Sequence, residues 1–163
     1  MIISVLLNHS LSSSDKLSLI IPQIIAVLII LFLILPLHEL AHGWVAYKFG
    51  DRTAKNAGRL TFNPLVSIDP WGALMILLFG FGWARPVPVN PNNFKNPRVG
   101  MAVTAAAGPI SNFLAALIGA FIYVSVLVGS GFSVSQLSFG MELLWTFIAI
   151  NISLAVFNLI PIP

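Results

Sequence analysis

The chain has 163 residues, of which 58% are hydrophobic and only 8% are charged. This composition, with a mean hydropathy of +0.96, excludes an ordinary soluble domain and indicates an integral membrane protein. The absence of cysteine excludes disulfides, iron–sulfur clusters and thiol catalysis. The length fits one small bundle, so we expect an all-α membrane protein with a single membrane-embedded domain over residues 1–163.

The first predicted elements are a tail and a long membrane span. Residues 1–16 start with a short apolar run and then become polar, which predicts a short N-terminal tail or partial helix outside the core. From about Leu17 to Tyr47 the chain is apolar enough to span, and at about 1.5 Å per residue it exceeds the roughly 30 Å of hydrocarbon. The last turns of this span are therefore expected to emerge. The sequence leaves open whether Pro36, which lacks a backbone donor, kinks the helix.

Within this span, His38, Glu39 and His42 form a His-Glu-x-x-His motif. On a helix the two histidines are one turn apart and share a face, so both imidazoles can bind one tetrahedral Zn²⁺. Glu39 is rotated by about 100° and can reach a metal-bound water instead. This is the arrangement of zinc metalloproteases, with two ligands and a general base. The alternative, histidines hydrogen-bonded between helices, leaves Glu39 in the membrane without a partner, at a cost of about 2.5 to 3.5 kcal/mol.

Seven of the eight Lys and Arg residues lie in two loops, 48–59 and 85–98. Such short basic loops report orientation, so we expect both to face the cytoplasm and do not expect nucleic acid as a partner. The apolar stretch 71–83 between them is too short to span the membrane. We therefore expect a re-entrant or short helix there, starting at Asp69-Pro70. The second loop is rich in Pro and Asn, which favours a lid over the mouth of the bundle.

Residues 58–68 carry a different pattern. Polar and apolar side chains alternate from Gly58 to Asn63, and a turn is expected at Asn63-Pro64. This alternation predicts a short β segment near residues 58–68, with a plain surface loop as the alternative.

Two further spans are predicted in the second half. The span from about Gly100 to Leu127 opens with small residues that let helices approach closely in lipid. Asn112 lies at the depth expected for the metal, where its amide either orients a substrate carbonyl or bonds a neighbouring helix. The last span runs from Met141 to Pro163 and carries Asn158 at a similar depth.

Three ordered motifs resemble the site-2 protease family of intramembrane zinc metalloproteases, peptidase family M50. They are the motif at residues 38–42 and the stretches 107–112 and 158–163. Within the family the chain is similar to the short bacterial branch without a PDZ domain, whose members also carry stretches like 57–70 and 82–91. The resemblance covers about residues 25–163.

The resemblance implies an enzyme that hydrolyses a peptide bond in or near a transmembrane segment of a membrane protein. His38 and His42 would bind one Zn²⁺ per chain, Glu39 would be the catalytic base, and Asn112 and Asn158 would bind substrate. The implied partners are a transmembrane protein substrate and the lipid bilayer of a bacterial inner or plasma membrane. The sequence does not decide between a monomer and a homo-oligomer.

One departure from the family pattern bears on activity. Family members continue past the Asn-Leu-x-Pro-x-Pro stretch into a Leu-Asp-Gly segment, whose aspartate is the third zinc ligand, and this sequence stops before that position. A catalytic zinc site normally has three protein ligands. We therefore expect either a C-terminally incomplete piece of a longer enzyme or an inactive membrane scaffold that lacks the third ligand. A small transporter is a further alternative, although the sequence has no internal repeat.

Overall fold

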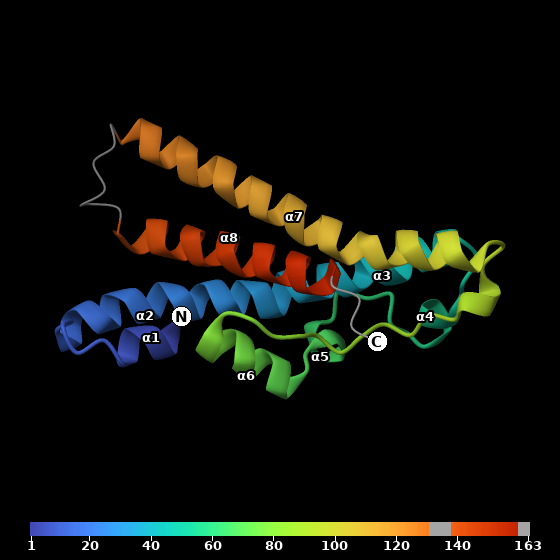
Figure 1. Ribbon diagram of the computed structural model, residues 1–163, viewed down its shortest axis with the longest axis horizontal. Coiled ribbons are helices and arrows are strands. Elements are labelled where there is room, and N and C mark those ends of the chain that lie inside the picture. Colours follow the sequence, from blue (N-terminus) through green and yellow to red (C-terminus); the bar gives the residue numbers. More distant parts are fainter. Residues whose placement is uncertain (131–137, 160–163) are drawn as a thin grey trace.

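The computed structural model describes residues 1–130 and 138–159, and its main elements are three long apolar stretches of helix (Figure 1). The first stretch, Ser13–Lys48, is continuous but changes its hydrogen-bond pattern partway. All three are long and apolar enough to cross a membrane, which confirms the predicted number of spans. Their elements are α2 (Ser13–Ile29), η1 (Ile30–Ile34) and α3 (Leu35–Lys48) in the first stretch, then α7 (Pro97–Gly129) and α8 (Ser138–Leu159). Residues 160–163, the end of the third resembling stretch, lie outside the described residues.

The long helices pack in a fixed order. α3 packs against α7, α2 packs against α8, and α7 and α8 pack against each other. α7 runs antiparallel to α3 in Figure 1. Its face toward α3 and α8 is built largely from small or polar residues, as the small-residue pattern predicted. The buried residues of α7 are Gly100, Thr104, Gly108, Pro109, Asn112, Ala116 and Gly119.

The wide turn η1 ends four residues before the motif, directly before α3. Here the Leu35 N–H donates to the carbonyl of Ile30, five residues back, so this turn is π-helical. Pro36 follows at the start of α3 and has no backbone N–H. The change from the π-helical to the α-helical pattern therefore falls at a residue that cannot donate a backbone hydrogen bond. π-turns inside helices are frequent at functional sites. The sequence left open whether Pro36 disturbs the helix; the structure has a widened turn just before Pro36, and His38 lies in the first turn of α3 after it.

The predicted β segment at residues 58–68 is wrong. Pro64–Ser67 forms a helical turn, α5, and no strand occurs among residues 1–130 and 138–159. The Asn63 side chain caps this turn by accepting from the Leu65 N–H, and Pro64 is suited to the first helical position. Gly58 has a left-handed φ of 67°, which interrupts an extended chain. The alternation of side chains was real, but a strand also needs a neighbouring strand to pair with, and none is present in this part of the chain.

The short helix predicted at 71–83 is present as α6 (Pro70–Phe79). Ten residues rise only about 15 Å, too little to span a bilayer. Asp69 caps the helix, as expected, by accepting from the N–H groups of Trp71 and Gly72, and Gly80 ends it with a left-handed φ of 85°. The chain then returns in an extended form past α5 toward α4 (Thr53–Asn56), as Figure 1 shows. This short helix and its return form a hairpin that rejoins the end of the bundle from which it came.

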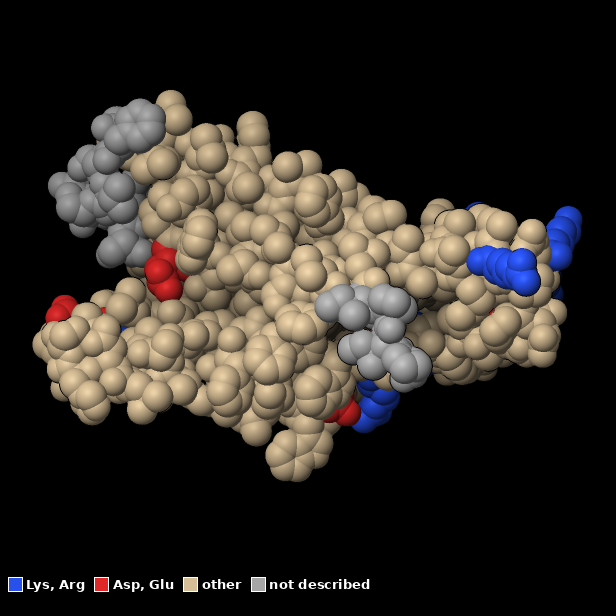
Figure 2. All heavy atoms as spheres, in the orientation of Figure 1, with Lys and Arg blue, Asp and Glu red and all other residues tan. Residues whose placement is uncertain are grey.

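The amino-terminal segment folds onto this hairpin. α1 (Ile2–Leu6) packs against α2 and α6, and Ile2 is buried. Charged side chains are unevenly distributed along the bundle. Lys and Arg gather toward the end that holds α4 and the start of α7 (Figure 2). Of the basic residues of the two loops, Lys48 ends α3, Lys55 lies in α4 and Arg98 lies in the first turn of α7, all at this end of the molecule.

Candidate metal centre

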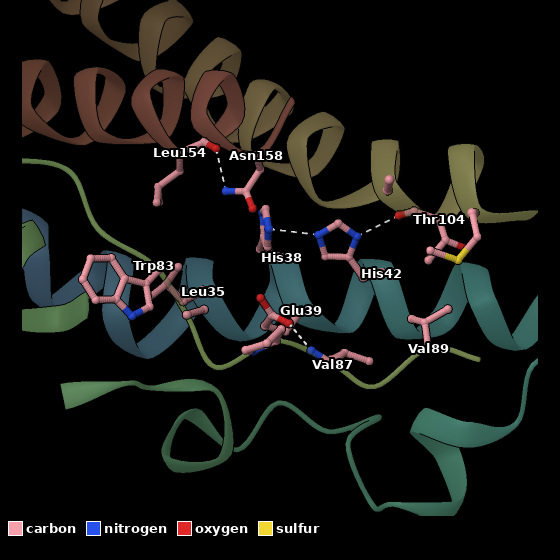
Figure 3. A pocket seen from close by; sticks show the side chains of 14 residues that line it. Leu35, His38, Glu39, His42, Trp83, Val87, Val89, Thr104, Leu154 and Asn158 are labelled. Carbon is pink, nitrogen blue, oxygen red and sulfur yellow. Dashed lines mark hydrogen bonds between the residues drawn. The ribbon is translucent and has the colours of Figure 1, made fainter. Parts of the chain in front are cut away.

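The motif residues project from α3 into a cavity of about 580 Å³ (Figure 3). His38 and Glu39 are almost fully buried, with 2% and 6% of their surfaces exposed, and His42 is half-buried. The remaining walls come from the extended chain after α6 and from α7 and α8. Four elements far apart in the sequence therefore meet around one histidine pair.

The two imidazoles converge on a common point. Their Nε2 atoms are 3.0 Å apart and the rings are nearly perpendicular. The Nδ1 atom of His42 lies 2.7 Å from the carbonyl oxygen of Thr104 on α7. A carbonyl can only accept, so Nδ1 of His42 carries the hydrogen and Nε2 presents its lone pair. This tautomer suits a metal ligand oriented by a backbone carbonyl.

The spacing of the imidazoles fits zinc. Two nitrogen ligands at about 2.0–2.1 Å from one tetrahedral Zn²⁺ are separated by about 3.3 Å. The observed 3.0 Å between the Nε2 atoms needs only a small adjustment to reach that separation. Among residues 1–130 and 138–159, no third His, Cys, Asp or Glu joins the pair to make a group of three. The described residues thus supply two side chains that could serve as zinc ligands.

Gly108 allows α7 to approach this pair. A Cβ atom at this position would lie 2.6 Å from Nε2 of His38 and still closer to Nε2 of His42. Only a residue without a side chain leaves that space to the imidazoles. The small residues of this span predict close helix packing, but the sequence alone does not reveal the role of Gly108.

Glu39 has a partner that the sequence did not reveal. The backbone N–H of Val87 donates to its Oε2 at 2.9 Å. Among the described residues none donates to the other carboxylate oxygen, Oε1. We call the extended segment 83–90, which includes Val87, the strap. The strap lines the cavity beside Glu39, at the place where a lid was expected (Figure 3).

The strap is held at both ends by polar contacts. Near its start, the Arg85 N–H donates to the carbonyl of Ser67 at 2.8 Å, and Arg59 donates to the carbonyl of Arg85 at 2.7 Å. At its other end the Asn90 N–H donates to Oδ2 of Asp51 at 2.8 Å. These contacts fix the backbone on either side of Val87.

Asp51 is a fully buried carboxylate just past the end of α3. It accepts from the backbone and hydroxyl of Thr53, from the Asn90 N–H and from the Asn93 side chain. Burial by itself raises the pKa of Asp51, but these hydrogen bonds outweigh burial and lower the pKa to about 2. The carboxylate is therefore ionised at neutral pH, and its charge strengthens the bonds that hold the strap.

The two predicted asparagines lie in different surroundings. Asn158 is exposed, lines the cavity and points toward His38 in Figure 3, while its Nδ2 donates to the carbonyl of Leu154 at 2.8 Å. Asn112 is completely buried between helices and is not among the residues that line the cavity. A third asparagine, Asn151, is equally buried and was not singled out from the sequence.

Comparison with known proteins identifies the family. Residues 26–139 match Peptidase family M50. The chain belongs to this family. It is 45% identical over 143 residues to "Putative zinc metalloprotease YwhC" of Bacillus subtilis (strain 168), covering 87% of this chain and 64% of that protein. It is 30% identical over 87 residues to "Putative zinc metalloprotease Rip2" of Mycolicibacterium smegmatis, covering 50% of this chain and 33% of that protein. The match thus spans less than two thirds of either relative. No solved structure matches the chain.

Replacing Asp51 tests the anchor of the strap. Asp51→Asn replaces one carboxylate oxygen with an NH₂ group, which cannot accept the hydrogen bonds that this oxygen accepts in the wild type. We therefore expect the free energy of unfolding at pH 7 to fall by about 1–3 kcal/mol. Because the folded pKa of Asp51 is lowered from 3.8 to about 2, its stabilisation is complete above about pH 4 and is lost as the pH falls through 2. As the pH falls from 4 to 2, the Asp51→Asn variant should therefore lose less stability than the wild type. Unfolding followed by near-UV circular dichroism in detergent measures both effects.

The matched control for Asp51 is Asp69→Asn, which keeps an acceptor for the start of α6. The free energy of unfolding of this control should stay close to that of the wild type. Equal stabilities of wild type and Asp51→Asn at pH 7 would contradict the role assigned to the anchor.

Replacing Gly108 tests the close approach of α7. The new methyl group of Gly108→Ala must displace one or both imidazoles, so we expect zinc affinity to fall at least about tenfold. Gly119→Ala on the same helix is the control, because the nearest atoms to its Cβ belong to the side chains of Phe147 and Ile148, at 3.0 Å and 3.1 Å. Competition with a chromophoric chelator measures both affinities. Wild-type affinity in Gly108→Ala would show that the imidazoles do not depend on this contact.

Proposed function

We propose that this M50 protein is an intramembrane zinc metalloprotease, which hydrolyses a peptide bond in or near a transmembrane segment of another membrane protein. The observation that carries the proposal is the convergence of two imidazole Nε2 atoms, which are 3.0 Å apart. Both imidazoles and a carboxylate line the same cavity and come from one apolar helix. Membership of the family and the names of two relatives support it. We assign His38 and His42 as ligands of one Zn²⁺ and Glu39 as the catalytic base.

Bound zinc would polarise the scissile carbonyl and lower the pKa of a water molecule. Glu39 accepts the proton of the attacking water at Oε1, the oxygen that the Val87 N–H leaves free, and passes it to the leaving amine. The Val87 N–H holds the carboxylate in place through Oε2 during both transfers. Asn158, exposed in the same cavity, is positioned to hold the substrate or to donate to its carbonyl oxygen.

The substrate must unwind to be cut, because a helix hides its carbonyl groups in its own hydrogen bonds. We propose that the end of the bundle rich in Lys and Arg faces the cytoplasm, as short basic loops generally do. His42 lies six residues before Lys48, or about 9 Å along the helix axis. The scissile bond would then lie inside the membrane but close to its cytoplasmic surface.

A second candidate is a membrane scaffold with the same fold and no catalysis. The observation that favours it is that, within the part of the chain that the structure describes, only two metal-ligating side chains meet at the site. A protease should bind zinc and should lose cleavage when Glu39 is replaced, whereas a scaffold would show no cleavage that depends on Glu39.

Replacing Glu39 separates these functions. Glu39→Gln keeps the size and one hydrogen-bond acceptor of the side chain but cannot take a proton, so cleavage should fall by at least about 10²-fold while zinc remains bound. The full-length protein would be co-expressed with a panel of tagged single-span membrane proteins, and the fragments would be quantified by immunoblot.

The control for Glu39 is Glu142→Gln. Glu142 accepts from Gln23 Nε2 at 2.8 Å, and Gln23 is fifteen residues before His38 on the same continuous helix, about 22 Å along its axis. Cleavage by this variant should match the wild type. Wild-type cleavage by zinc-loaded Glu39→Gln protein would overturn the assignment of the base.

A further inference from the structure

Two buried polar groups at the histidine pair have no hydrogen-bond partner within residues 1–130 and 138–159. Asn112 has no exposed surface, and none of these residues bonds its Oδ1 or its Nδ2. The Nδ1 atom of His38 is likewise buried and has no partner in this part of the chain. Leaving such a buried group without a partner destabilises the folded protein. A pairing between these two residues would remove part of that cost for both.

The register of α3 and α7 brings the two side chains toward each other. The helices are antiparallel, with His42 beside Thr104 and His38 beside Gly108. Asn112 is one turn beyond Gly108. Side chains lean toward the N-terminus of their own helix, so in an antiparallel pair His38 leans toward the level of Asn112 and Asn112 leans back toward His38. The Asn112 amide lies near the imidazole, as do the Gly108 backbone and the Asn158 side chain. The Gly108 carbonyl already accepts from Ser111, and Asn158 donates to the Leu154 carbonyl, whereas both polar atoms of Asn112 lack a partner among the described residues.

His42 shows what such a partner does. Its Nδ1 donates to the carbonyl oxygen of Thr104, which leaves Nε2 free for a metal. His38 needs the same tautomer if its own Nε2 is to bind the same ion, and its Nδ1–H then requires an acceptor. Metal-ligating histidines almost always have one. Asn112 Oδ1, one turn beyond Gly108 on α7, is an acceptor that no described residue bonds.

We propose that Asn112 is a positioning residue, whose Oδ1 accepts the Nδ1–H of His38 and so directs Nε2 of His38 toward the metal. The inference rests on the proposed zinc site and decides between the two roles that the sequence left open for Asn112. An amide that lines no part of the cavity does not touch substrate. Asn112 and the Thr104 carbonyl thus form a matched pair of acceptors, one behind each imidazole.

Zinc affinity of the full-length protein in detergent tests this role without any substrate. Asn112→Leu removes the acceptor at similar volume and should weaken Zn²⁺ binding by about 10–100-fold. Asn112→Asp keeps an acceptor at the same position and should stay within a few-fold of the wild type. If leucine prevents folding, Asn112→Ala removes the same acceptor with a smaller side chain. Affinities come from competition with a chelator, and folding is checked by the unfolding temperature of the metal-free protein.

Asn151→Leu is the matched control, because Asn151 is equally buried but donates to the Phe147 carbonyl of its own helix, at 2.9 Å. It should leave zinc affinity unchanged. The absorption spectrum of Co²⁺-substituted protein gives a second readout, which should shift in Asn112→Leu and stay unchanged in Asn151→Leu.

Three outcomes would overturn the inference. Wild-type zinc affinity and cobalt spectrum in Asn112→Leu would refute it and leave the proposed function standing. Equal weakening by Asn112→Leu and Asn151→Leu would show a general effect of removing a buried amide. A wild-type protein that binds no zinc would refute the proposed function and this inference together.

Discussion

The site depends on the close contact between α3 and α7 at Gly108. Without a side chain there, the backbone of α7 comes near enough for the Thr104 carbonyl to fix the tautomer of His42 and for the two Nε2 atoms to converge. In lipid, where apolar burial does not drive helices together, such close packing of small residues is itself the main source of association. The same residues that let the helices pack therefore also shape the candidate metal centre.

The second constraint is the carboxylate inside an apolar helix. Glu39 is nearly buried, yet the strap brings a backbone N–H to one of its oxygens and leaves the other free. Asp51 binds the far end of the strap from just beyond α3, in the basic region of the molecule. Asp51, which lies beyond the end of α3, thus helps to position the Val87 N–H, and that N–H holds Glu39 within α3.

The sequence predicted those features that depend on local pattern. Hydropathy and length identified the three spans, the short helix now seen at Pro70–Phe79 and its cap at Asp69, and the one-turn spacing placed His38 and His42 on one face. The β segment at 58–68 failed because alternation cannot supply a pairing strand. The bond from Val87 to Glu39 joins residues 48 positions apart, so no local pattern encodes it. Gly108 gave a partial signal through the small residues around it, but its contact with the imidazoles depends on the register of two helices.

The central claim is that His38 and His42 together bind zinc. Zinc K-edge X-ray absorption of the purified full-length protein tests this claim most directly, because it counts imidazole ligands and measures their distances. The account predicts stoichiometric zinc with two imidazole nitrogens at about 2.0–2.1 Å and the remaining positions filled by oxygen. Protein without zinc, or zinc whose spectrum shows no imidazole, would contradict it.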